Sequence, residues 1–240
     1  MSLDLSKKKV LDLSKKAETV IQKLNLSKFR ARVIFVADVS GSMKSLYTRG
    51  VMQNVYERIM ALALKFDDNG SLENMVFDHG VLDLPEATLD DIGLYVERNI
   101  IKNPTIKWGM TNYAPPLRKI RDMVAVRPKG FFAMFSKPRP ASKDPVYVVF
   151  LTDGENYDEP ETRQALIELS AFPVFVKFLG IGSSRFPMLE KLDTMDGRVV
   201  DNANFQAITD IARISDEELY HRLLVEVSDW EQAAKAAQVL

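Results

Sequence analysis

One apolar segment constrains the fold of this chain more than any other feature. It comprises Arg32-Val33-Ile34-Phe35-Val36-Ala37, and the polar loop Asp38-Val39-Ser40-Gly41-Ser42-Met43 follows at once. A continuous run of β-branched and aromatic residues that ends in a Gly-containing turn predicts a strand buried on both faces. Open α/β sheets place their ligand sites at the carboxyl ends of such strands.

Two further apolar segments, residues 146–151 and 174–179, also end in Gly-containing loops, and helical patterns separate the three. Strands that alternate with helices predict a doubly wound, Rossmann-like α/β fold with a mostly parallel sheet and helices on both faces. Two short strands, 74–78 and 81–84, flank His79-Gly80. A connection this tight predicts a hairpin, and therefore one antiparallel strand at the sheet edge.

The domain organisation that we expect has three parts. Residues 1–28 form a lead-in amphipathic helix and linker, residues 29–230 form the α/β domain, and residues 231–240 form a C-terminal tail. Within the domain, residues 127–143 are rich in Pro, Gly, basic and aromatic residues, which predicts a surface excursion. The other expected elements are helices near 51–66, 89–96, 116–124, 165–169, 186–192 and 216–227, and a short strand at 198–200.

The composition narrows the functional classes. The 240 residues are 46% hydrophobic and 27% charged, with a net charge of −1, which argues against chain-wide attraction to nucleic acid or anionic membrane. Cysteine is absent, so disulfides, zinc–thiolate sites and cysteine catalysis are excluded. The first residues lack the apolar region of a signal peptide, and no window is apolar enough to span a bilayer. We therefore expect a cytoplasmic protein.

The loop after the first strand carries three oxygen ligands at alternate positions, Asp38, Ser40 and Ser42. One carboxylate and two hydroxyls suit a hard divalent cation such as Mg²⁺ better than zinc or copper. If segments 32–37 and 146–151 are neighbouring parallel strands, Asp153 reaches the same rim. Taken alone, Asp and Ser before a helix also serve as N-caps, and Asp-Gly after a strand also serves as a turn.

With Thr111 on a further loop, the pattern resembles a von Willebrand factor type A (vWA) domain with a metal-ion-dependent adhesion site (MIDAS). The resemblance implies that Ser40, Ser42 and Thr111 bind the ion directly. It implies that Asp38 and Asp153 act directly or through water, and that a partner's Asp or Glu carboxylate completes the coordination. The expected cofactor is a divalent cation, Mg²⁺ first, with Mn²⁺ and Ca²⁺ as alternatives. Neighbouring residues that we consider for partner contact are Met43, Asn112 and Glu155.

Blocks further along the chain are similar to the TerF-like tellurite-resistance and stress-response branch of these domains. They include Phe150-Leu151-Thr152-Asp153-Gly154, Phe178-Leu179-Gly180-Ile181-Gly182 and Leu192-Asp193-Thr194-Met195-Asp196-Gly197-Arg198. This resemblance implies a non-catalytic interaction module whose partners include other tellurite-resistance proteins.

Two alternatives stay open at this point. A metal-dependent hydrolase or phosphatase could use the same rim, with one ion flanked by the carboxylates of Asp38, Asp153, Glu155 and Asp158. The histidines, His79 and His221, have no motif that ties them to the serines as a general base. The basic and aromatic excursion at 127–143 could instead dock on membrane or single-stranded nucleic acid, although a loop that packs back or meets a protein is the favoured interpretation.

Overall fold

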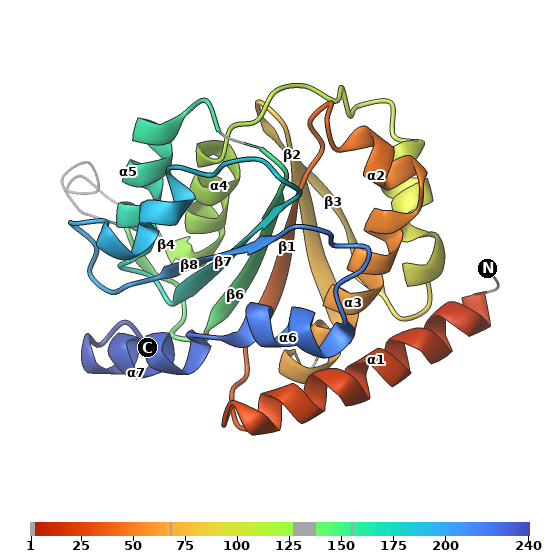
Figure 1. Ribbon diagram of the computed structural model, residues 1–240. Helices are drawn as coiled ribbons and strands as arrows, with labels where there is room; N and C mark the ends of the chain where they lie inside the picture. The colour runs from red at the N-terminus through yellow and green to blue at the C-terminus, as the bar shows by residue number, and fades with distance from the viewer. Residues whose placement is uncertain (1–2, 68, 127–137, 155) are drawn as a thin grey trace.

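The computed structural model describes residues 3–67, 69–126, 138–154 and 156–240, which contain a six-stranded sheet with the order β3-β2-β1-β6-β7-β8. All neighbouring strands are parallel except β3, which pairs antiparallel with β2 at one edge. This arrangement confirms the predicted α/β fold and its antiparallel edge strand (Figure 1). The strands are β1 (Arg32–Asp38), β2 (Ser71–Phe77), β3 (Val81–Thr88), β6 (Val146–Thr152), β7 (Val174–Ile181) and β8 (Ala203–Ile208).

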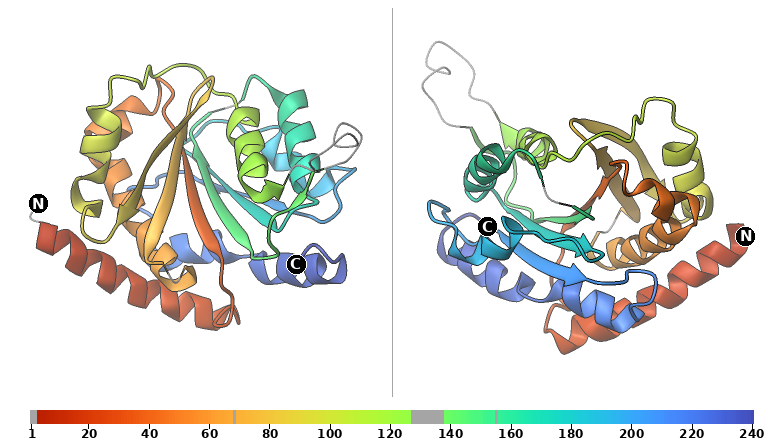
Figure 2. Two further views of the ribbon diagram at one scale, coloured as in Figure 1. Left: turned by 180° about the vertical axis from the view of Figure 1, so that it is seen from behind. Right: turned by 45° about the horizontal axis from the view of Figure 1, so that its top comes forward.

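Helices cover both faces of the sheet (Figure 2). One face carries α1 (Leu3–Lys23), α3 (Val51–Phe66), α6 (Asp216–Leu224) and α7 (Val227–Ala236), and the other carries α4 (Ala114–Val124) and α5 (Glu159–Leu169). The short α2 (Lys44–Thr48) connects the loop after β1 to α3. Three further short helices are η1 (Ile92–Leu94), η2 (Glu97–Ile101) and η4 (Leu189–Thr194).

The central strands contribute to two hydrophobic cores in alternation. Val33, Phe35 and Ala37 of β1 face the α1/α3 side, whereas Ile34 and Val36 face the α4/α5 side. Each of these five side chains is fully buried. Because both faces of β1 are covered, the strand needs apolar residues at every position, which explains its unbroken hydrophobic sequence.

The strand register places the candidate ligands at one edge of the sheet. Ala37 of β1 pairs with Leu151 of β6, so Asp38 and Thr152 end adjacent strands side by side. On the other side of β1, Asp38 pairs with Phe77 of β2. The loops that follow β1, β2 and β6 therefore leave the sheet together, at its carboxyl edge.

The predicted strand at 198–200 is wrong. These residues form a bend in which Arg198 donates a hydrogen bond of 2.7 Å to the carbonyl of Leu192. The last strand is β8, whose Asn204 is buried against the fully buried Lys177 of β7, with Nζ 2.5 Å from Oδ1. A buried polar pair of this kind interrupts the apolar pattern, and the sequence therefore did not indicate the strand.

Three other segments either have a secondary structure that differs from the prediction or lie partly outside the described residues. The closing helix ends at Leu224, and α7 begins after Glu226, which has a φ of 71°. Residues 231–236, expected in a tail, belong to α7. Of the excursion, 127–137 lies outside the described residues, while Arg139–Pro140 (β5) pairs antiparallel with Ala125–Val126 (β4).

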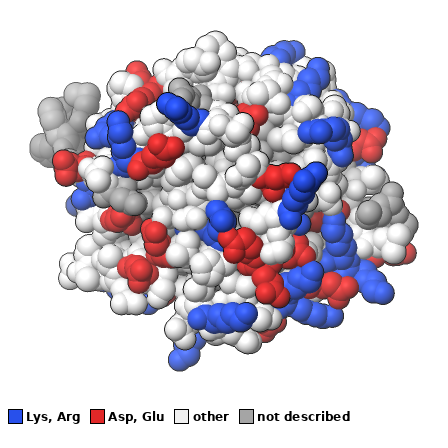
Figure 3. All heavy atoms as spheres, in the orientation of Figure 1, with Lys and Arg blue, Asp and Glu red and all other residues white. Residues whose placement is uncertain are grey.

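Acidic and basic side chains are interspersed over the face seen in Figure 3, in keeping with the near-zero net charge. In the described part of the chain, no helix combines the length and apolar character required to cross a membrane.

Candidate metal centre

Asp38 is the most buried member of the site, with no exposed surface. Its Oδ1 accepts a hydrogen bond of 2.6 Å from the Ser40 backbone N–H, and its Oδ2 accepts one of 2.7 Å from the Thr152 hydroxyl. Burial raises the pKa of Asp38 to about 6, against the lowering effect of these hydrogen bonds. The carboxylate is therefore fixed in orientation by a backbone group of the loop that follows β1 and by a side chain of the adjacent strand β6.

The two serines join the Asp38 loop to Asp153. The Ser40 and Ser42 hydroxyl oxygens lie 3.1 Å apart, and the Ser42 hydroxyl donates a hydrogen bond of 2.8 Å to Oδ1 of Asp153. Burial raises the pKa of Asp153, while the hydrogen bond from Ser42 opposes the rise. Asp38, Ser40, Ser42 and Asp153, predicted from separate parts of the sequence, thus form one connected group.

Thr111 belongs to a loop that backbone hydrogen bonds hold against this group. The Gly41 N–H donates to the Gly109 carbonyl at 3.2 Å, and the Asn112 N–H donates to the Asp78 carbonyl at 2.8 Å. At Gly109, a Cβ would lie 3.0 Å from Asp78 Oδ2 and from His79 Nδ1, so glycine allows this close approach without displacing the two side chains. Thr111 itself is only 6% exposed.

Asp158 has a different role from the one that the hydrolase alternative requires. Its carboxylate accepts hydrogen bonds from the backbone N–H groups of Tyr113 and Ala114, at 3.0 and 2.8 Å. These donors lie at the start of α4, where backbone N–H groups lack helical partners. Asp158 therefore caps α4, and with the Tyr157 N–H bound to the Thr111 carbonyl at 3.1 Å it joins the β6–α5 loop to the Thr111 loop.

Three supporting residues were not identified from the sequence. Thr152 holds Asp38, as described, and the Tyr47 hydroxyl donates to the Asp38 carbonyl at 3.0 Å. The Tyr113 hydroxyl donates to the Gly154 carbonyl at 2.5 Å. All three side chains are buried, and of the three only Thr152 directly adjoins a predicted ligand, Asp153. Buried Thr and Tyr are ordinary core residues, so the sequence carried no specific signal for them.

The oxygen atoms present fit a hard divalent cation. Mg²⁺ binds oxygen ligands at about 2.0–2.1 Å in an octahedron, so adjacent ligands lie about 3 Å apart. The Ser40–Ser42 and Ser42–Asp153 oxygen separations, 3.1 and 2.8 Å, match that spacing. Among the described residues no three His, Cys, Asp or Glu side chains gather as a metal cluster, so a cation here would depend on the hydroxyls.

The three residues that we considered for partner contact differ in their exposure to solvent. The Met43 side chain is fully buried, so its assignment to a partner surface is wrong: it packs into the core beneath the loop. Asn112 is half-buried beside the site, and Glu155 lies outside the described residues. The structure instead exposes Met110 and Tyr157, at 57% and 72%, on either side of the Thr111–Tyr157 backbone contact.

Among the described residues, neither histidine forms a hydrogen bond with Ser40 or Ser42. His79 Nδ1 lies 3.1 Å from Oδ1 of its neighbour Asp78, and the His79 carbonyl accepts a hydrogen bond from the Asn112 side chain at 3.4 Å. His221 lies on α6, which packs against α1. A serine nucleophile would need a base within hydrogen-bonding reach, and the described contacts of Ser40 and Ser42 offer them only carboxylate, hydroxyl and backbone groups.

The sheet order, the two helical layers and the loop cluster at the carboxyl edge define a von Willebrand factor type A domain. Residues 30–240 match the vWA-TerF-like family, described as the vWA found in the TerF C terminus. The chain therefore belongs to the vWA-TerF-like family.

Two known proteins illustrate this relationship. The uncharacterized protein YcbR of Bacillus subtilis (strain 168) is 40% identical over 229 residues, which cover 94% of this chain and 88% of YcbR. Proximal thread matrix protein 1 from the mussel byssus superposes with a TM-score of 0.57 at 17% identity, covering 82% of this chain and 47% of that one. Its form with a zinc-occupied MIDAS motif gives 0.55 at 18% identity, covering 83% and 48%. The chain thus spans about half the length of those solved chains, and at these identities the likeness concerns the fold.

Proposed function

We propose that this protein is a non-catalytic interaction module that captures an acidic side chain of a protein partner through a bound divalent cation. Ser40, Ser42 and Thr111 would hold the ion, and Asp38 and Asp153 would set its charge environment from the first or second coordination shell. The bound ion supplies a Lewis-acid position for an incoming carboxylate. Mg²⁺ is the ion that we favour, with Mn²⁺ and Ca²⁺ as alternatives.

One observation carries this proposal: the hydrogen-bonded series Ser40–Ser42–Asp153, at 3.1 and 2.8 Å. It brings neutral and charged oxygens to a rim where Ser42 is exposed to solvent. Neutral hydroxyls leave a divalent ion incompletely neutralised, so an external carboxylate is electrostatically favoured as the last ligand. The engagement of Asp158 with the α4 backbone removes one carboxylate that a hydrolytic centre would use.

Membership of the vWA-TerF-like family suggests which proteins to test first as partners. The vWA-TerF-like description refers to the TerF C terminus, so other tellurite-resistance and stress-response proteins are the partners that we propose first. Each would have to present an accessible Asp or Glu.

Calorimetric titration with Mg²⁺ and Mn²⁺ tests the metal site. We expect Ser42→Ala to weaken binding at least about tenfold, as the loss of a ligand or its orienting partner commonly does. The control is Ser45→Ala, an exposed serine on α2 that is not among the proposed ligands. Equal affinities for wild type and Ser42→Ala would contradict the proposal.

A further inference from the structure

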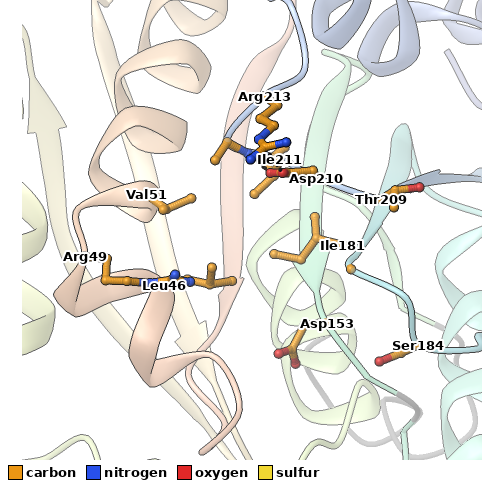
Figure 4. A pocket seen from close by; sticks show the side chains of 12 residues that line it. Leu46, Arg49, Val51, Asp153, Ile181, Ser184, Thr209, Asp210, Ile211 and Arg213 are labelled. Atoms are coloured by element: carbon orange, nitrogen blue, oxygen red, sulfur yellow. Dashed lines mark hydrogen bonds and ion pairs between the residues drawn. The ribbon is translucent and has the colours of Figure 1, made fainter.

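A groove of about 400 Å³ opens directly beside the candidate metal centre (Figure 4). Asp153 lies at one end of it. Leu46 of α2 and Arg49, which directly follows α2, form one wall, and the segment after β8 provides the opposite wall with Asp210 and Arg213. Ile181 and Ile211 contribute buried apolar surface between the walls. The volume falls within the range of about 300–1,000 Å³ typical of ligand pockets.

The groove is lined by two arginines, Arg49 and Arg213, and two aspartates, Asp153 and Asp210. Arg213 forms an ion pair with Asp210, with Nε 3.4 Å from the carboxylate. Arg49 is exposed, and its Nε donates only to the Ser45 carbonyl at 3.2 Å. Within the described residues no carboxylate pairs with Arg49, so its positive charge is available to an anionic group that enters the groove.

Building on the proposed metal function, we propose that this groove binds a second carboxylate of the same partner segment. The first carboxylate would go to the cation held by Ser40 and Ser42, and the second would pair with the Arg49 guanidinium across the groove from Asp210. An arginine–carboxylate pair is directional and can be bidentate, so it selects the spacing of the two acidic residues. The partner segment is therefore one with two acidic residues, rather than a single exposed Asp or Glu.

The geometry favours this occupant for two reasons. Asp153 contacts Ser42 and also lines the groove, so a chain bound at the metal centre continues directly into it. Ile181 and Ile211, which are 2% and 4% exposed, also line the groove, and such an apolar floor offers the second carboxylate no polar group that would compete with Arg49.

NMR titrations in Mg²⁺ with synthetic Gly/Ser peptides test the proposal. The peptides carry one glutamate, two glutamates at several spacings, or one glutamate and one lysine at the same spacings. For wild type we expect the best two-glutamate peptide to bind about three- to tenfold more tightly than the one-glutamate peptide. Arg49→Gln removes this preference, and Arg49→Glu transfers it to the glutamate–lysine peptide.

The control variant is Arg139→Gln, an exposed arginine on β5 that does not line the groove, and it should retain the wild-type preference. Mg²⁺-dependent binding of the one-glutamate peptide without any preference for two glutamates would overturn this inference and leave the metal function intact. A preference that survives both Arg49 substitutions would have the same consequence. If Mg²⁺ affects the binding of no peptide, the metal function itself is wrong, and this inference with it.

Discussion

The Ser42 hydroxyl donates a hydrogen bond of 2.8 Å to Oδ1 of Asp153, 111 residues away in the sequence. This contact joins the loop after β1 to the loop after β6, strands that lie side by side in the sheet. The two residues are far apart in the sequence, and the parallel pairing of their strands brings them into contact. The candidate centre is therefore a product of the fold, and changes at either strand end should alter it.

Asp38→Ala should abolish both metal binding and metal-dependent capture of a partner. The substitution removes a buried carboxylate that accepts hydrogen bonds from Ser40 and Thr152, and with it the orientation of the loop. Calorimetry with Mg²⁺, and affinity capture with and without a chelator, measure the two effects. A thermal melt separates loss of the site from loss of the fold, and Asp38→Asn, which keeps the shape but not the charge, provides a second variant. Undiminished Mg²⁺ binding by a folded Asp38 variant would contradict the assignment.

Thr152→Val tests whether the support of Asp38 matters as much as the ligands themselves. Valine keeps the shape of the buried side chain but cannot donate to Asp38 Oδ2. We expect Mg²⁺ affinity to fall by about tenfold or more, the usual effect of losing a group that orients a ligand. The free energy of unfolding should fall by about 1–3 kcal/mol, because the Asp38 oxygen is left without its donor.

The control for this variant is Thr48→Val, an exposed threonine whose hydroxyl contacts only α2 carbonyls. An unchanged Mg²⁺ affinity in Thr152→Val would show that the Thr152 hydroxyl does not organise the site.

Much of the candidate centre could be predicted from the sequence because its geometry follows from strand order. Asp38 and Asp153 each follow an apolar segment, and neighbouring parallel strands end at one rim. The burial of Met43 could not be predicted, since a residue next to a polar turn gives no indication of which way its side chain packs. The location of Tyr157 beside the site could not be predicted either, because it depends on a backbone hydrogen bond between two loops, from the Tyr157 N–H to the Thr111 carbonyl.

The sequence predicted strands correctly where both faces of the strand are apolar. The prediction failed where a strand buries a pair of polar side chains. β1 and β6 are apolar at nearly every position, and their burial follows directly. β8 contains the buried Asn204, whose Oδ1 accepts a hydrogen bond from Lys177 of the adjacent strand. A single sequence cannot reveal that such a lysine and asparagine satisfy each other inside the protein.

Tyr157→Ser should weaken partner binding without changing Mg²⁺ affinity. Tyr157 is 72% exposed next to the candidate centre, and exposed aromatic residues commonly supply the largest contributions to an interface. We expect a loss of about 1–2 kcal/mol in partner affinity. The measurement is quantitative affinity capture in Mg²⁺ alongside metal calorimetry. Val199→Ser, a similarly exposed apolar residue away from the centre, is the control, and an equal loss in both variants would contradict a specific role for Tyr157.

Asp216 should make the free energy of unfolding decrease at acidic pH. It begins α6 and accepts hydrogen bonds from Lys16 of α1 at 2.6 Å and from Arg58 of α3 at 2.9 Å, so it connects three helices. Burial raises the pKa of Asp216, but the Lys16 hydrogen bond and the Arg58 charge outweigh it and hold the pKa below its ordinary value. The folded state therefore binds a proton less readily than the unfolded state. The stabilisation is present above the unfolded pKa of about 3.9 and is lost as pH falls through the lower folded value.

Asp216→Asn should accordingly lower the free energy of unfolding by about 1–2 kcal/mol at pH 7. The difference from wild type should shrink below about pH 4, where the wild-type carboxylate becomes protonated as well. Denaturant unfolding at a series of pH values measures this. Asp12→Asn is the matched control, because its ion pair with Lys15 within α1 is exposed and such pairs contribute little. A difference between wild type and Asp216→Asn that stays constant down to pH values well below 4 would show that the charge of Asp216 does not stabilise the junction of α1, α3 and α6.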